Sequence, residues 1–260
     1  MKTVELEIPA TRVPAGTCAN IVIRPGALAM SPYCLLFNDE SSQYFFVSDV
    51  WCGRDSVMVA RGAVPARSFS DQAEREEIYL GFVPADPDPG EIYDTFQIAQ
   101  DPRLSRAGLT IGVYNMSGIE RTIFGRIQCR VETGKEVRSP SRFRTALGLG
   151  YTMVPGRQAC NVSVMPHLLF RPDRLVIPSD IGAHFSVLSI RRIAQPSGDC
   201  LRSAPVSTHG ENYSEEISAT KSLMHFGSIR PGDFLCVFVE NRTDDPIPFS
   251  GAFFGEGAFE

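Results

Sequence analysis

One strand-like stretch occurs twice in the chain, and this repetition constrains the fold more than any other feature. VPAGTCANIVIRP (13–25) is followed 141 positions later by VPGRQACNVSVMP (154–166), with valine, proline, asparagine and proline in matching places. YFFVSDV (44–50) and HFSVLSI (184–190) match in the same way, 140 positions apart. Self-similarity at a nearly fixed separation predicts two copies of one structural unit.

A third match closes each half of the chain. IGVYNMSGIERTIFG (111–125) matches VFVENRTDDPIPFSG (237–251) at a separation of 126 positions. The shorter separation implies about fourteen extra residues in the first half. We expect them in FVPADPDPGEIYDTFQIAQDPRLSR (82–106).

The matched blocks have the composition of β-strands. They are short, rich in β-branched and aromatic residues, and bounded by Pro, Gly, Asn, Asp or Ser. NMSG and NRTDD are turn sequences, which predicts an antiparallel hairpin at the end of each half. The nearest helical signal lies in residues 68–81, where Ser70 would cap a short helix through Glu76. The fold class is therefore predicted to be all-β, with two tandem, internally duplicated antiparallel β-sandwiches.

The duplication places one sandwich at residues 1–133 and the second at 147–260, with a basic linker at 134–146. This stretch is poor in aliphatic residues, and charge runs of this kind are usually solvated. The alternative is a basic strap that touches phosphate or an acidic neighbour, with weak and salt-sensitive binding. The arginines of this region are Arg138, Arg142 and Arg144.

The bulk composition is that of a soluble globular protein. The chain has 260 residues, of which 43% are hydrophobic and 21% charged. No apolar run approaches the roughly 18 residues of a membrane span, and the N-terminal stretch MKTVELEIPATRVPAG lacks the apolar core of a signal peptide. A net charge of −5 gives no global attraction to nucleic acid or anionic membranes.

Motifs for catalysis or metal binding are not found in the sequence. The seven cysteines have no spacing typical of a zinc site, and the four histidines form neither HxH nor HExxH. GxSxG and glycine-rich nucleotide motifs are absent as well. The acidic stretch ADPDPGEIYD (85–94) is a conceivable calcium loop, but its prolines favour an acidic surface loop. We therefore expect no enzymatic activity, no cofactor and no bound metal.

Asn-x-Ser/Thr triplets and aromatic residues also allow two interpretations. Four triplets match glycosylation acceptors, which carry little meaning without a secretion signal. They begin at Asn115, Asn161, Asn212 and Asn241. A carbohydrate-binding surface would need exposed aromatic platforms, but most phenylalanines and the single tryptophan, Trp51, fall in strand blocks. Core packing explains them better.

The C-terminal stretch GAFFGEGAFE brings three phenylalanines together. They are Phe253, Phe254 and Phe259. One interpretation is a flexible apolar tail that reaches a neighbouring subunit, and the other is a last strand that frays. With Arg138, Arg142 and Arg144, these phenylalanines form the set of candidate subunit-contact residues.

Two tandem sandwiches in a chain of this size resemble the double-jelly-roll coat proteins of icosahedral viruses and phages. The paired blocks 13–25/154–166 and 111–125/237–251 carry the resemblance and span most of the chain. About six or seven strands can be recognised in each half, against the eight of many such rolls. The resemblance implies jelly-roll-like sandwiches and, in such coats, a near-hexagonal capsomer made of three chains.

The resulting functional hypothesis is a self-assembling structural subunit, a capsid or coat protein that forms a ring or shell. Its partners would be copies of itself and other virion proteins, with a weak contact to nucleic acid. It would be located in the virion after assembly in the host cytoplasm, and otherwise in the cytoplasm. The alternative is a ligand- or carbohydrate-binding tandem β-sandwich without catalytic activity.

Overall fold

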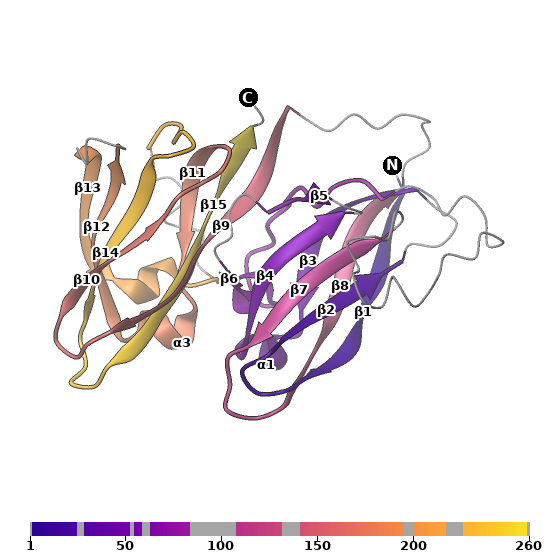
Figure 1. The fold of residues 1–260 in the computed structure, drawn as a ribbon, viewed down its shortest axis with the longest axis horizontal. Helices are drawn as coiled ribbons and strands as arrows, with labels where there is room; N and C mark the ends of the chain where they lie inside the picture. Colours follow the sequence, from indigo (N-terminus) through magenta and orange to yellow (C-terminus); the bar gives the residue numbers. More distant parts are fainter. Residues whose placement is uncertain are drawn as a thin grey trace. The chain divides into compact units, whose positions relative to one another are not determined.

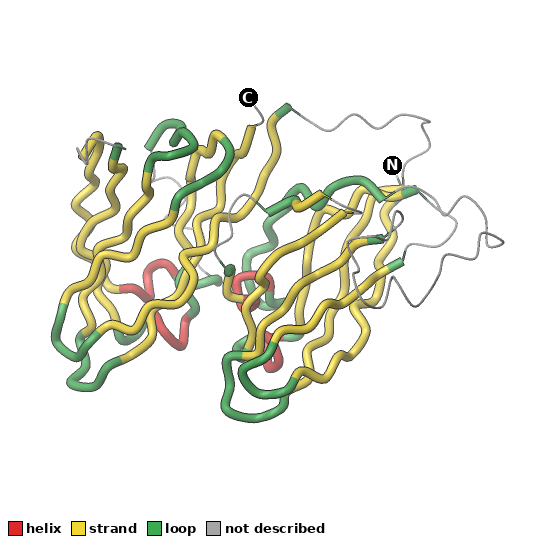
Figure 2. Tube along the Cα trace, viewed as in Figure 1, coloured by secondary structure: helices red, strands yellow, loops and turns green. Residues whose placement is uncertain are grey.

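A computed structural model describes residues 2–24, 29–52, 55–58, 63–83, 108–131, 141–194, 200–216 and 226–258. Strands dominate this part of the chain (Figure 1, Figure 2). Two compact units are formed, and each is described separately. Unit 1 comprises Met1–Met58, Phe69–Asp71 and Arg75–Pro140, and unit 2 comprises Val59–Ser68, Gln72–Glu74 and Ser141–Glu260. The prediction of an all-β fold of two antiparallel sandwiches is confirmed.

Unit 1 is built from a three-stranded sheet and a second antiparallel sheet. The three-stranded sheet has the order β1-β8-β3, formed by Thr3–Val13, Arg121–Val131 and Met30–Phe37. The second contains β2-β7-β4-β5, formed by Cys18–Ile23, Leu109–Asn115, Phe45–Cys52 and Asp55–Ser56. A one-turn helix α1 (Asp39–Ser42) follows β3, and the side chain of Asn38 caps it by accepting a hydrogen bond from Ser41 N at 3.2 Å.

Unit 2 repeats this plan with its own strands. Its three-stranded sheet has the order β11-β15-β9, formed by Leu169–Val176, Ile247–Ala258 and Arg142–Val154. The second sheet has the order β10-β14-β12-β13, formed by Ala159–Val164, Phe234–Asn241, Phe185–Ile193 and Cys200–His209. The short elements are β6 (Val64–Pro65), η1 (Ala66–Phe69), α3 (Ser179–Gly182) and η3 (Gly210–Tyr213). Within the described residues, no helix has the length and apolar character needed to span a membrane.

The strand order of each unit is that of a jelly roll. The eighth position, beside β3 or β11, is filled by an extended segment with few ladder bonds. In unit 1, Met30 and Val83 exchange two hydrogen bonds of 2.9 Å. In unit 2, Phe170 and Ile229 exchange bonds of 2.9 and 2.7 Å. This sparse pairing explains why only six or seven strands per half can be recognised from the sequence.

The helix that the sequence predicts to begin at Ser70 is not formed, so this prediction is wrong. Ser70 instead forms a bridge with Phe37, and Ile78 N donates a hydrogen bond of 2.7 Å to Tyr33 O. Backbone pairing with β3 therefore outweighs the local helical signal, because packing against a sheet buries more apolar surface than an isolated turn of helix.

The irregularities of the ladders are duplicated along with the strands. Proline interrupts the register of β3 with β8 at Pro32 and the register of β11 with β15 at Pro172, 140 positions later. The pairings β4–β7 and β12–β14 shift register after Val47 and after Val187, again 140 positions apart. Bulges re-aim side chains and bend strands, so their repetition shows that the two units share backbone geometry as well as topology. Of the repeated blocks 13–25 and 154–166, residues 18–23 and 159–164 form the equivalent strands β2 and β10.

Strand β15 differs from its counterpart β8 because both of its faces are buried. Phe253 and Phe254 are neighbours that point to opposite faces, and both are 0% exposed. On the inner side, the rings of Phe249 and Phe185 meet edge to face at 5.2 Å and join the two sheets. Along the outer side runs a stretch of the first half of the chain that is grouped with unit 2.

We call residues 63–68 and 72–74 the covering segment. Its strand β6 contacts β9 and β15, and Ala63 O accepts a hydrogen bond of 3.2 Å from Gly150 N. The sequence duplication predicts these residues in the first sandwich, at 1–133. Strand β9 begins at Arg142, so residues 142–146 of the expected linker form its start.

Candidate functional site

The candidate contact residues are distributed between the core, the surface and undescribed parts of the chain. Phe253 and Phe254 are buried inside unit 2, so they do not form the flexible tail that one interpretation proposed. Arg142 and Arg144 lie on β9. Arg138, Phe259 and the acidic stretch 85–94 lie outside the described residues.

The two arginines on β9 have different environments. Arg144 forms a two-pronged ion pair with Asp173, whose second contact joins Nη2 to Oδ1 at 3.2 Å. Arg142 is 3.4 Å from Glu256, and the two side chains are 74% and 42% exposed. Arg144 is therefore held against its own sheet, whereas Arg142 remains accessible from solvent.

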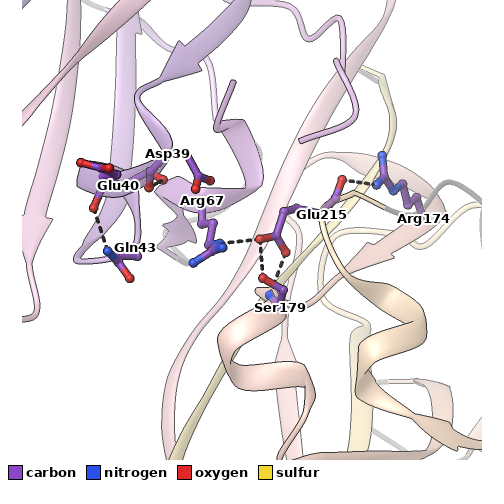
Figure 3. A network of polar contacts seen from close by, with 8 residues as sticks. Asp39, Glu40, Gln43, Arg67, Arg174, Ser179 and Glu215 are labelled. Atoms are coloured by element: carbon purple, nitrogen blue, oxygen red, sulfur yellow. Dashed lines mark hydrogen bonds and ion pairs between the residues drawn. The ribbon is translucent and has the colours of Figure 1, made fainter. Parts of the chain in front are cut away.

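Glu215 is the centre of a buried polar network in unit 2 (Figure 3). Its side chain is 1% exposed, and Oε1 accepts from Arg67 Nε at 2.5 Å and from Ser179 Oγ at 2.9 Å. Oε2 accepts from the backbone N of Ser179, the first residue of α3, at 2.8 Å. The carboxylate thus connects the covering segment to the start of α3, and both of its oxygens accept hydrogen bonds.

Arg174 forms the second half of the network. It lies on β11 with its side chain 1% exposed, and its Nη1 is 2.6 Å from Glu74 Oε2. Nη2 donates to Glu215 O at 3.0 Å, and Glu74 N donates to the same carbonyl at 2.9 Å. A buried charge of this kind is tolerated because a partner charge and hydrogen bonds compensate its loss of hydration.

Asp180 lies at the edge of this network. Burial raises the pKa of its carboxyl group, while the positive charge of Arg67 acts in the opposite direction and Glu215 raises it further. Perturbed carboxyl groups mark catalytic sites or structural ion-pair networks. The engaged carboxylate of Glu215 and the buried guanidinium of Arg174 are typical of the structural kind.

Asn115 ends β7 and closes the last hairpin of unit 1. It is fully buried, and its Nδ2 donates to Val13 O at 2.8 Å and to Ile119 O at 2.9 Å. Its Oδ1 accepts from the backbone N of Ser117 at 2.9 Å and from the Ser117 hydroxyl at 2.7 Å. One side chain therefore joins β1, β7 and the turn.

Asn241 performs the same task in unit 2. Its Nδ2 donates to Val154 O at 3.0 Å and to Asp245 O at 2.8 Å. Its Oδ1 accepts from Thr243 N at 2.9 Å and from the Thr243 hydroxyl at 2.8 Å. The Asn-x-Ser/Thr pattern at these two positions is thus explained by turn structure, because the acceptor amide is buried and hydrogen-bonded.

The buried thiols are poorly suited to nucleophilic chemistry. Burial raises the pKa of Cys34 and of Cys129 to about 11, so both remain protonated at neutral pH. Six described cysteines are free thiols. Across the described ranges, no three His, Cys, Asp or Glu side chains gather closely enough to hold a metal ion.

One pocket of about 400 Å³ opens on unit 2. Its polar lining consists of Ser141, Arg142, Arg171, Ser228 and Glu256. This volume is within the range of small-molecule sites. Accessible charge and a concave surface coincide in this pocket.

Sequence reasoning missed the network, and of the pocket lining it singled out only Arg142. Arg67, Arg174 and Glu215 are separated by 41 to 148 positions, so no spacing motif connects them. The duplication did contain the signal for the buried asparagines, since Asn115 and Asn241 were matched as members of a repeated block. Their structural role follows only from the three-dimensional contacts.

The strand order defines the class of protein as an all-β chain of two jelly-roll units. No family model and no curated protein matches the sequence. Among solved structures, the chain is similar to the major capsid protein P2 from bacteriophage PM2, with 10% identity and a TM-score of 0.40. The match covers 100% of this chain and 98% of that chain.

Proposed function

We propose that the protein is a self-assembling structural subunit of the kind that forms viral and phage coats. One observation supports this above all: the chain repeats a complete roll, including its bulges and its buried asparagine turns. The repeated features are those that define shape. The buried charged side chains that could take part in chemistry, such as Glu215 and Arg174, are not repeated between the units, and they form contacts inside unit 2.

A pseudo-duplicated subunit has an advantage in closed assemblies. It presents two similar sets of strand edges that differ in side chains, so neighbouring copies can be distinguished while the contacts remain nearly equivalent. The partners in this proposal are other copies of the chain, and its location is the virion.

Exposed apolar side chains on an edge strand provide further support. Tyr151 and Met153 lie two residues apart on β9, at the edge of its sheet, and each is 52% exposed. Met165, just beyond the edge strand β10, is 49% exposed. Because Phe253 and Phe254 are buried, Tyr151 and Met153 replace them as our preferred contact residues.

Assembly can be tested by light scattering and negative-stain imaging of the purified protein at near-physiological salt. Rings or shells are the expected result. The double variant Tyr151→Glu/Met153→Glu should weaken them, because charge on an edge strand opposes pairing. Thr122→Glu provides the control, because Thr122 is exposed on the central strand β8 and lies on no strand edge, so this variant should assemble as the native chain does.

A native protein that stays monomeric at about 100 μM, a concentration at which micromolar contacts would be populated, would contradict the proposal. The alternative, a ligand-binding tandem sandwich, would then take its place. Deletion of residues 253–260 is not a clean test of assembly, since it removes the end of β15 from the core.

A further inference from the structure

The pocket of unit 2 lies on the outer face of the sheet β11-β15-β9, at the end where β9 begins and β15 ends. The strand register places the pocket there. Glu256 of β15 pairs with Arg171 of β11 on one side and with Arg144 of β9 on the other, and Ala258 pairs with Arg142 of β9. Directly paired residues of neighbouring strands share a face of the sheet. Strand geometry therefore presents Arg142, Arg171 and Glu256 to the same space.

The charges around this space are not balanced. Arg171 is exposed and forms no ion pair within the described part of the chain. Arg142 has Glu256 at 3.4 Å, a separation that leaves most guanidinium donors open. Two arginines face one carboxylate, so the pocket carries a net positive charge.

Hydroxyl groups complete the lining. Ser141 precedes β9, and Ser228 belongs to the extended segment that pairs with β11 through Ile229 and Phe170. Guanidinium forks and hydroxyls are the donor set that recognises the oxygens of phosphate or carboxylate groups.

The equivalent region of unit 1 lacks this donor set although its backbone is the same. Ser31 takes the place of Arg171, because Pro32 and Pro172 are equivalent. Phe82 takes the place of Ser228, next to the bridging residue Val83. Arg130 takes the place of Glu256 and is engaged with Glu77 at 2.5 Å. The polar lining of the pocket is therefore specific to unit 2 and does not follow from the jelly-roll backbone that both units share.

We propose that this pocket binds the phosphate or carboxylate group of a small ligand. Arg171 supplies the principal charge and fork of donors, and Arg142 supplies the second. The Ser141 and Ser228 hydroxyls donate to the remaining oxygens. Glu256 orients Arg142 and limits affinity by repelling the anion. The inference does not depend on assembly, because every lining residue belongs to one unit of one chain.

Calorimetric titration tests the proposal with inorganic phosphate and, separately, with acetate, at an ionic strength held constant with sodium chloride. Saturable binding of at least one anion to the native chain is expected. Arg171→Gln should weaken that binding by about tenfold or more, since a charge-assisted pair is lost. Glu256→Gln should increase the affinity, because it removes the carboxylate that repels the anion.

Arg12→Gln is the matched control. Arg12 is an exposed arginine on β1 without an ion pair among described residues, and its loss should leave the affinity unchanged within about twofold. Tighter binding of phosphate than of acetate would assign the ligand to phosphate esters, and the reverse to carboxylic acids. Absence of saturable binding by both anions, or equal affinities of Arg171→Gln and native protein, would overturn the proposal.

Discussion

The outer faces of the two three-stranded sheets have the same backbone and opposite chemistry. On β8 this face carries Arg126 and Gln128, opposite Glu7 and Glu5 of β1. The equivalent residues of unit 2 are Ala252 and Phe254 on β15, opposite Gly148 and Ala146 on β9. In unit 1 the face is charged and partly exposed, with Glu5 accepting a hydrogen bond of 2.9 Å from Gln128. At these positions of unit 2 the face is apolar and buried, and it becomes polar only at the end that carries the pocket.

The covering segment accounts for this difference. Where residues 63–68 and 72–74 lie on the sheet, small residues and Phe254 provide a packed interior, and Arg174 is compensated by Glu74. The same strand order thus yields a solvated face or a second core according to whether the chain covers it. Duplicated structure does not require duplicated surface.

The largest expected effect comes from breaking the buried network at Glu215. Glu215→Ala leaves the Arg67 guanidinium and the Ser179 donors without their acceptor, and should cost about 3–5 kcal/mol of unfolding free energy. Urea unfolding followed by circular dichroism measures the loss, while Trp51 fluorescence reports on unit 1. Asp71, which follows η1 as Glu215 follows η3, is exposed, so Asp71→Ala should stay within about 0.5 kcal/mol. Similar losses in both variants would remove the distinction between the units.

Truncation of the two matched outer-face residues should give the next largest contrast. Phe254→Ala leaves a cavity under the covering segment and should cost about 3–4 kcal/mol. Gln128→Ala, at the equivalent position on β8, removes one exposed hydrogen bond and should cost about 0.5 kcal/mol or less. The same urea titrations measure both, and a small effect of Phe254→Ala would show that this face is not packed.

The buried asparagines should respond alike, in contrast to the outer faces. Asn115→Ala and Asn241→Ala each remove an equivalent set of hydrogen bonds and should each cost about 2–3 kcal/mol. Thermal and urea unfolding of the two variants would be compared directly. A difference well above 1 kcal/mol, the size of a single net hydrogen bond, would mean that the two turns are not energetically equivalent.

The smallest effect concerns the turn that precedes β2 and β10. Gly16 has φ of +64°, and its equivalent Arg157 has φ of +56°, a conformation that side chains with a Cβ rarely adopt. Gly16→Ala should therefore destabilise unit 1 by about 1 kcal/mol. Arg157→Gly should raise the midpoint of thermal unfolding, because glycine relieves the strain. A lower midpoint for Arg157→Gly would show that the exposed contact with Asp244 outweighs backbone strain.

The sequence was sufficient to predict the two-sandwich fold because strands and turns leave local patterns of residue types. Strand blocks, turn residues and the repeated Asn115 and Asn241 predicted two sandwiches, and the strand order agrees. The buried pair Phe253 and Phe254 was open to two interpretations, since adjacent apolar residues occur both in tails and in strands covered on both faces. Arg174, Glu74 and Glu215 could not be associated at all, because their contacts depend on how the covering segment returns to unit 2. Ala146 and Gly148 on β9, opposite β15, were a usable signal, because small side chains leave room for a covering segment.

The covering segment also has a consequence for biosynthesis. Residues 63–74 leave the ribosome about 180 residues before the end of β15, which corresponds to roughly 10–40 s at ordinary rates of translation. During this interval the nascent chain contains the covering segment but not the complete sheet that it covers. Conversely, a fragment that starts at residue 141 lacks the covering segment and would expose Ala146, Val176 and Phe254 to water. Until β15 is complete, the covering segment of a nascent chain therefore has no finished sheet to pack against.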